Sequence, residues 1–161
     1  MLLPIVNAAE THEVLALALQ IVRECILKNI PNLDTFHSGG GYRMLALLLD
    51  QKSFVSTELL EHYFAFSVHG FDPSLDTSLP RSSWSSSDWV LSDLDALKYI
   101  LMNHQVWDMQ SSGPEISSHF LYLLNGLVLN SSRHALFNAR RLHILGMVRW
   151  TVHFMIEVSE L

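Results

Sequence analysis

A glycine-rich stretch that runs into a leucine-rich segment, FHSGGGYRMLALLL at residues 36–49, constrains the fold of this chain more than any other feature. Three consecutive glycines favour a turn, and the apolar residues after them are spaced as in a helix. A second stretch, LHILGMVRW at residues 142–150, shares with it the pattern apolar-His-x-x-Gly-x-x-Arg. A structural unit used more than once is typical of helical repeat proteins, so the pattern indicates helices stacked in series.

The glycines of both stretches, Gly39, Gly40, Gly41 and Gly146, are interpreted as structural turns between helices, where positive φ is needed. Glycines before a helix can also bind phosphate through free backbone amides. This sequence lacks the lysine and hydroxyl of the G-x-x-x-x-G-K-[ST] loop, and no strand is predicted before the glycines. The turn is therefore the preferred interpretation.

Apolar residues recur at helical spacing in about seven segments, and no segment has the alternation of a strand. The predicted helices cover residues 12–29, 42–51, 56–69, 88–107, 114–130, 133–145 and 147–158. Thr11 and Ser56 are predicted N-caps, and Ser112 with Glu115 forms a Ser-x-x-Glu capping box around Pro114. Pro31 is expected to end the first helix. We therefore predict an all-α fold, an armadillo/HEAT-like solenoid segment, with a closed helical bundle as the alternative.

Residues 71–87, FDPSLDTSLPRSSWSSS, interrupt this pattern and predict a flexible Ser/Pro-rich insertion within a single domain that spans residues 1–161. Trp84 stands alone in this insertion. Tryptophan is favoured at interface hot spots, so Trp84 is a possible partner contact. Trp89, Trp107 and Trp150 are instead expected to fill space between helices.

The composition excludes several functional classes. A net charge of −6 argues against binding to nucleic-acid phosphates, and the four arginines at positions 133, 140, 141 and 149 are too few to reverse it. The single cysteine, Cys25, allows no intrachain disulfide and fits a reducing cytoplasm. No apolar run reaches the roughly 18 residues of a membrane span, and the first residues make a poor signal peptide.

No residue pattern points to catalysis, to a metal or to a cofactor. The nine histidines are scattered over the predicted helices, and no pair with helical spacing has a carboxylate on the same face. A G-x-S-x-G elbow is absent, and Asp93 and Asp95 are predicted on different sides of their helix. We therefore expect a protein that is not an enzyme. The alternative is a small all-α ligand-binding bundle or an enzyme, which would enclose a pocket with several converging polar groups.

The chain resembles the armadillo-like helical region of the BEACH-domain proteins, the group of the lysosomal-trafficking regulator and the neurobeachins. The matching residues lie in three places. They are Gly40, Gly41, Tyr42, Met44, Leu45 and Leu48; then Leu97, Ile100, Leu101, Val106 and Trp107; and finally Phe137, Asn138, Leu142, Leu145 and the apolar helix that ends at Glu157. The likeness covers most of residues 12–158 and rests on general features of helical repeats.

The resemblance implies a scaffold in vesicle, lysosome or autophagy-related membrane traffic, with no catalytic residues to transfer. Its expected partners are neighbouring helical repeats of the same larger protein and other proteins. The implied location is cytoplasmic, at most peripheral to endolysosomal membranes, with indirect membrane association. A segment of this kind is expected to expose apolar residues on its terminal helices, because repeats bury them against their neighbours.

Overall fold

The computed structural model describes residues 2–52, 56–73, 86–103, 106, 109–129 and 132–159. These residues are mainly helical, which confirms the all-α class. The elements in chain order are α1 (Leu3–Asn7), α2 (His12–Leu27), α3 (Ile30–Ser38), α4 (Gly41–Asp50), α5 (Thr57–Ser67), strand β1 (Val68–His69), the 3₁₀ turn η2 (Ser86–Asp88), strand β2 (Val90–Leu91), α6 (Leu94–Ala96), the π-helical turn η3 (Leu97–Leu101), α7 (Met109–Val128), α8 (Ala135–Ile144) and α9 (Met147–Ser159).

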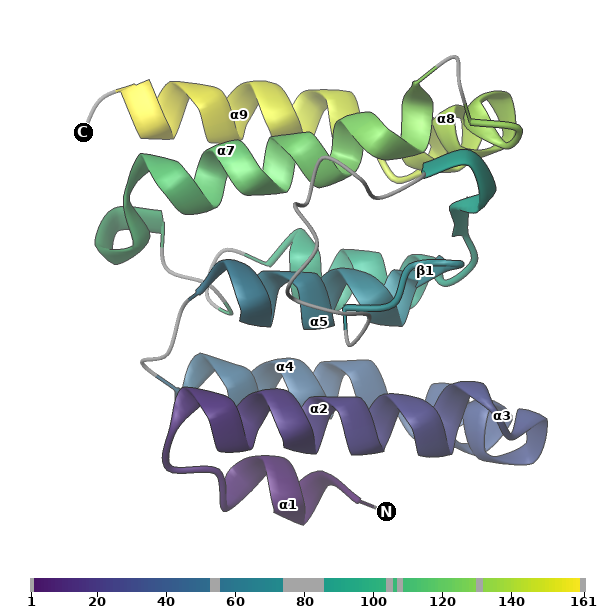
Figure 1. Ribbon diagram of the computed structural model, residues 1–161, viewed down its shortest axis with the longest axis vertical. Coiled ribbons are helices and arrows are strands. Elements are labelled where there is room, and N and C mark those ends of the chain that lie inside the picture. The colour runs from purple at the N-terminus through teal and green to yellow at the C-terminus, as the bar shows by residue number, and fades with distance from the viewer. Residues whose placement is uncertain are drawn as a thin grey trace.

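The long helices lie in layers that follow one another along the longest axis of the molecule (Figure 1). The first layer contains α2 and α4, the second α5 and the continuous α6–η3 helix, and the third α7 and α9; α1 lies beside the first layer. Helices α2, α5 and α7 run in one direction, and α4, α6–η3 and α9 run back (Figure 1). Between layers, α2 packs on α5, α4 packs on η3, and α5 packs on α7.

Side-chain caps fix where several helices begin. Thr11 Oγ1 accepts the Val14 amide at the start of α2. Ser56 Oγ accepts the Leu59 amide of α5 at 3.1 Å. These are the two N-caps that the sequence predicted, and each satisfies an amide that has no partner within the helix.

The core is densest around α5, which lies between α2 and α7. All of its residues from 59 to 67 are buried. Trp89 packs edge-on against two aromatic rings, with centroids 5.7 Å from Phe64 and 5.1 Å from Phe71. Helix α5 is thus enclosed on all sides, as a helix in the middle of a stack must be.

Helix α3 was missed because Pro31 was interpreted as the end of a helix. Helix α2 ends earlier, at Leu27, and Pro31 lies in the first turn of α3. Asn29 caps this helix by accepting the Asn32 amide at 3.2 Å. Proline is well tolerated in a first turn, where its missing N–H would have had no helical partner. The short helix α1, which also has a proline in its first turn, was missed as well.

The prediction that no strand forms was wrong. Val68 pairs with Leu91 and His69 with Val90 in an antiparallel two-stranded ribbon. Two residues are too few to show the alternation by which a strand is recognised, and the pairing joins distant parts of the chain. This ribbon also moves the start of the next helix from the predicted position 88 to Leu94.

The capping box at residues 112–115 was also assigned wrongly. Helix α7 begins at Met109 and continues through these residues. Pro114 is the sixth residue of α7, so its missing N–H removes one hydrogen bond from the helical ladder without ending the helix. Most of the predicted insertion, including Trp84, lies outside the described residues, as does Trp107.

Candidate functional site

The two stretches with the apolar-His-x-x-Gly-x-x-Arg pattern form two corners of the same kind. We call residues 32–43 the first corner and residues 138–149 the second corner. In each, a short helix (α3 or α8) leads through a turn into the last helix of its layer (α4 or α9), on the same side of the molecule (Figure 1).

A glycine in the left-handed region makes the turn in both corners. Gly40 has φ 67° and Gly146 has φ 72°, values that residues with a side chain rarely adopt. Gly39 has an ordinary φ of −82°, so it does not need the freedom of glycine for the turn. Gly41 begins α4, and a Cβ there would lie 2.5 Å from the Phe36 ring. Gly40 therefore allows the turn, whereas Gly41 leaves room for the Phe36 ring.

An asparagine outside the shared sequence pattern extends the likeness. Asn32 and Asn138 stand at the same place before the two glycines. Asn32 Nδ2 donates to the carbonyl of Cys25 at 2.9 Å, and Asn138 Nδ2 donates to that of Leu127 at 2.9 Å. Both acceptors lie near the end of the preceding long helix. The shared spacing in the sequence was the signal that could have revealed this residue.

The first corner is covered by the second layer. His37 Nε2 lies 2.9 Å from Asp93 Oδ2, and His37 Nδ1 lies 3.3 Å from Asp95 Oδ2. The Tyr42 hydroxyl donates to Asp93 Oδ2 at 2.8 Å. Burial, followed by the charge of Asp93, raises the pKa of Tyr42, so its hydroxyl remains a donor at neutral pH.

Asp93 joins this corner to the helix above it. It is buried, and its Oδ1 accepts the amides of Asp95 and Ala96 at 3.0 Å each, which caps α6. One carboxylate thus starts a helix in the second layer and binds His37 and Tyr42 in the first. Since these residues are far apart in the sequence, helical periodicity could not predict the contact.

A polar cavity of about 270 Å³ opens beside the first corner. Arg43 at its edge donates to the Tyr99 hydroxyl at 2.6 Å, and its guanidinium lies 4.8 Å from the centre of the Tyr99 ring. The lining residues are His37, Ser38, Gly40, Gly41, Tyr42, Arg43, Asp95 and Tyr99. In this lining His37 pairs with Asp95, and Arg43 binds Tyr99, so these side chains already have partners across the two layers.

The second corner has the same asparagine, histidine, glycine and arginine, but no described helix covers it. The side chains of His143 and Arg149 are exposed and make no hydrogen bond or ion pair with other described residues. Val148 is 69% exposed, whereas Tyr42 at the same place after its glycine is 2% exposed. Val152 is 54% exposed, and its counterpart Ala46 is 5% exposed. The side of α9 that corresponds to the covered side of α4 is therefore apolar and open.

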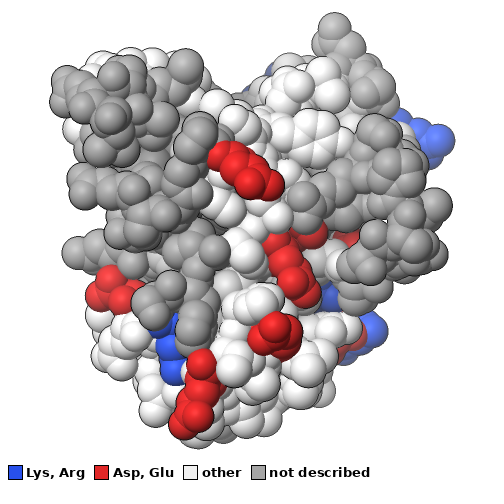
Figure 2. All heavy atoms as spheres, turned by 60° about the vertical axis from the view of Figure 1, so that its left-hand side comes forward, with Lys and Arg blue, Asp and Glu red and all other residues white. Residues whose placement is uncertain are grey.

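Acidic side chains gather elsewhere, on the face where α2 and α5 begin (Figure 2). Glu13 and Glu58 occupy the first turns of these helices. Backbone hydrogen bonds, followed by the Thr11 side chain, lower the pKa of Glu13. These acids stabilise the positive ends of helix dipoles, which accounts for their position without a ligand.

Two buried polar groups hold layers together inside the stack. His119 Nε2 of α7 lies 2.8 Å from Glu61 Oε1 of α5. Arg23 is buried and donates to Asp72 at 3.0 Å and to Glu24 at 3.1 Å. Burial, followed by the charge of Arg23, lowers the pKa of His62 to about 4, so His62 is neutral at physiological pH. Within the described residues, no group of three or more His, Cys, Asp or Glu could hold a metal ion.

Two of the four tryptophans, Trp89 and Trp150, lie within the described residues. Trp89 is buried, and Trp150 donates its indole N–H to the Met102 carbonyl at 2.9 Å.

Among the described residues, no helix combines the length and apolar character that crossing a bilayer requires. Comparisons with protein-family models, curated proteins and solved structures gave no match.

Proposed function

We propose that this protein is a non-enzymatic helical-repeat scaffold that holds helical partners through the open side of its second corner. The observation that carries the proposal is the contrast between matching positions: Val148 and Val152 are exposed where Tyr42 and Ala46 are covered by a helix. Exposed apolar residues at positions that the same chain buries elsewhere are the expected sign of a contact surface.

The order of the layers supports a solenoid of the armadillo/HEAT type. The last helix of each layer begins at Gly41, Leu94 and Met147, which are equally spaced along the chain. In solenoids each unit contacts only its neighbours, and a further unit stacks on the last one. In the second layer the β1–β2 ribbon stands where the other two layers have a short helix.

The partner is a helix whose first turn carries acidic side chains. At the first corner, such a helix supplies Asp93 and Asp95 to His37, and Tyr99 to Arg43. At the second corner His143 and Arg149 offer the same groups, with the exposed Arg140 nearby in the sequence. Carboxylates near the start of the bound helix would complement these cations and stabilise the helix dipole.

The cellular role follows from the resemblance to BEACH-domain proteins. We place the scaffold in lysosomal and vesicle membrane traffic, on the cytoplasmic side and peripheral to endolysosomal membranes. Its partners there would be neighbouring helical repeats of a larger protein and other proteins with an acid-capped helix.

Fluorescence anisotropy with a labelled peptide tests the proposal. The peptide copies residues 92–103, SDLDALKYILMN, with a hydrocarbon staple that keeps it helical. Val148→Glu should weaken its binding at least about tenfold, because it places a carboxylate on the apolar side of α9. Leu17→Glu is the matched control, since Leu17 is exposed to a similar degree on α2. Equal binding by both variants, or none by the native protein, would overturn the proposal.

A second candidate function is the binding of a small polar molecule in the cavity of the first corner. Its volume of about 270 Å³ and its polar lining favour this alternative. A thermal-shift screen with small carboxylates and phosphates, run on the native protein and on Arg43→Met, would decide. Stabilisation that depends on Arg43 would favour a ligand-binding protein over a scaffold.

A further inference from the structure

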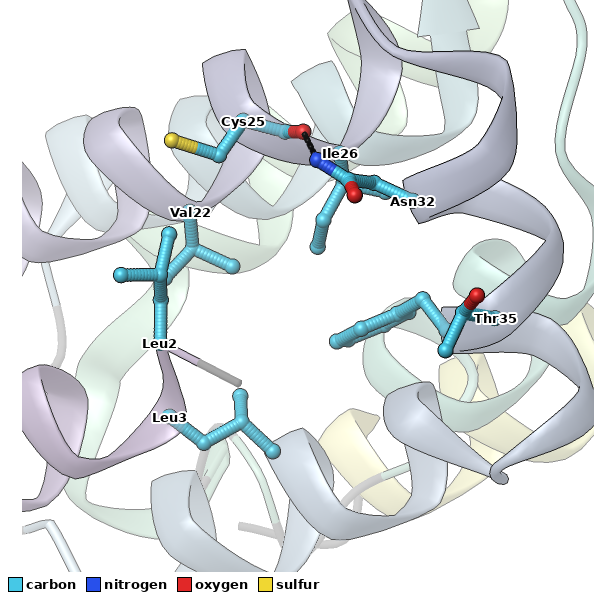
Figure 3. A pocket seen from close by; sticks show the side chains of 8 residues that line it. Leu2, Leu3, Val22, Cys25, Ile26, Asn32 and Thr35 are labelled. Atoms are coloured by element: carbon cyan, nitrogen blue, oxygen red, sulfur yellow. Dashed lines mark hydrogen bonds between the residues drawn. The ribbon is translucent and has the colours of Figure 1, made fainter.

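An apolar pocket of about 210 Å³ lies between α1, α2 and α3 (Figure 3). Leu3, Val22, Ile26 and Phe36 form its apolar wall, and Asn32 lies at its edge. The pocket is smaller than those that enclose drug-sized ligands, so it suits a single large side chain. Helix α1, which supplies Leu3 to this pocket, lies on the side of the first layer that faces away from the second layer (Figure 1).

The second corner shows what the matching asparagine does when a neighbour is present. Asn138 is fully buried. Its Oδ1 accepts the Leu91 amide at 2.8 Å, and its Nδ2 donates to the Trp89 carbonyl at 2.8 Å. One side chain therefore binds two backbone groups of a short extended segment that contains β2.

The side chains of that segment fill apolar space beside the asparagine. Leu91 is fully buried and Trp89 is 3% exposed. The Trp89 ring lies against α7, where a Cβ at Gly126 would come within 2.5 Å of it. Backbone hydrogen bonds to Asn138 and buried side chains together hold the extended segment on this corner.

Asn32 has the same side-chain amide, but only its Nδ2 makes a hydrogen bond with a described residue. Its Nδ2 donates to Cys25, as Asn138 donates to Leu127 (Figure 3). Asn32 is exposed, and its Oδ1 makes no hydrogen bond with other described residues. An asparagine amide has two N–H donors and an oxygen with two lone pairs, so a donor and the acceptor remain for a ligand.

We infer that this pocket binds an extended peptide segment of a partner protein. The segment places one large apolar or aromatic side chain against Val22, Ile26 and Phe36. Its backbone N–H and C=O bind Asn32 in the way that Leu91 and Trp89 bind Asn138. This surface lies apart from the open side of α9, so the inference stands without the proposed function.

NMR titration with the chain's own extended segment tests the inference. The probe is the peptide Ac-SSDWVLS-NH₂, which copies residues 86–92. We expect it to shift the side-chain amide signal of Asn32 and the methyl signals of Val22 and Ile26, and to leave the signals of α9 unchanged. The peptide with Trp89→Ala should bind at least about tenfold more weakly.

Three protein variants test whether the peptide binds at Asn32 and the apolar pocket. Asn32→Ala should weaken binding, Thr35→Phe should block the pocket from its rim, and Asn125→Ala, an exposed change on α7, should have no effect. Two variants of different kinds keep the test valid if one of them unfolds. Unchanged binding by both Asn32→Ala and Thr35→Phe would overturn the inference. Shifts produced by free indole and not by the peptide would also overturn it, because they would define a site for small apolar molecules.

Discussion

The two corners share a turn glycine with positive φ and the same asparagine, histidine and arginine, yet the first is covered and the second is open. At the first corner His37 and Tyr42 bind Asp93 of the next layer. At the second corner His143 and Val148 stand at the same places and are exposed. The glycine of the shared pattern thus serves the turn within a layer, whereas the histidine and arginine serve contacts between layers.

The asparagines show the reverse difference. Asn138 binds the layer before it through buried hydrogen bonds, whereas the matching Asn32 is exposed beside a pocket. Each corner therefore has a side that faces the preceding layer and a side that faces the following one. In the described chain, the first corner has only the short helix α1 on its outer side, and no helix lies beyond the second corner.

We expect the largest difference in the free energy of unfolding between the variants Asn138→Ala and Asn32→Ala. The first change leaves the Leu91 amide and the Trp89 and Leu127 carbonyls buried without this partner, and should lower the free energy of unfolding by about 3–5 kcal/mol. The second removes one exposed hydrogen bond and should cost about 0.5–1 kcal/mol. Urea unfolding followed by circular dichroism measures both. Equal costs would show that the two asparagines do not have the different surroundings described above.

Asp93→Ala should have the next largest effect. It removes the cap of α6 and leaves the buried Tyr42 hydroxyl without its acceptor, which should cost about 2–4 kcal/mol. Asp95→Ala is the control, because its side chain is 54% exposed and the loss should be below about 1 kcal/mol. Similar melting temperatures for the two variants would contradict the role of Asp93 as the link between layers.

Replacing either turn glycine by alanine should lower the free energy of unfolding by a similar amount. Gly40→Ala and Gly146→Ala each force a Cβ into the left-handed region, at a cost of about 1–2 kcal/mol. Apart from the glycine and its two neighbours in the chain, no atom lies within 4 Å of a Cβ at either position, so the cost arises from the backbone conformation. Asparagine in place of alanine should restore part of the stability, since it tolerates this region better. Unfolding costs that differ by more than about 1 kcal/mol would break the equivalence of the turns.

The smallest predicted difference in stability is between the variants His37→Ala and His143→Ala. His37→Ala removes contacts with two carboxylates at a half-exposed position and should cost about 0.5–1 kcal/mol. His143→Ala removes an exposed side chain and should change stability by less than about 0.5 kcal/mol. Thermal unfolding of the two variants at neutral pH is the measurement. A larger loss for His143→Ala would mean that the second corner is not open.

Helix positions were predictable where apolar spacing is regular and a cap is present, as at α2 and α5. The Gly40 and Gly146 turns were predictable because the same pattern occurs twice. The helix after Pro31 was not, since proline both ends one helix and begins another. The contacts of His37 with Asp93 and Asp95 depend on how layers stack, and nothing local in the sequence encodes that distance.

Methyl NMR of the native protein titrated with the stapled peptide of residues 92–103 tests the central claim most directly. If the second corner is an uncovered copy of the first, the largest shifts will occur at Val148, Val152 and Ile144. The signals of Val14, Leu17 and Ile21, which are also exposed apolar residues but lie on α2, will remain unchanged. Shifts centred on α2, or none at saturating peptide, would contradict the claim.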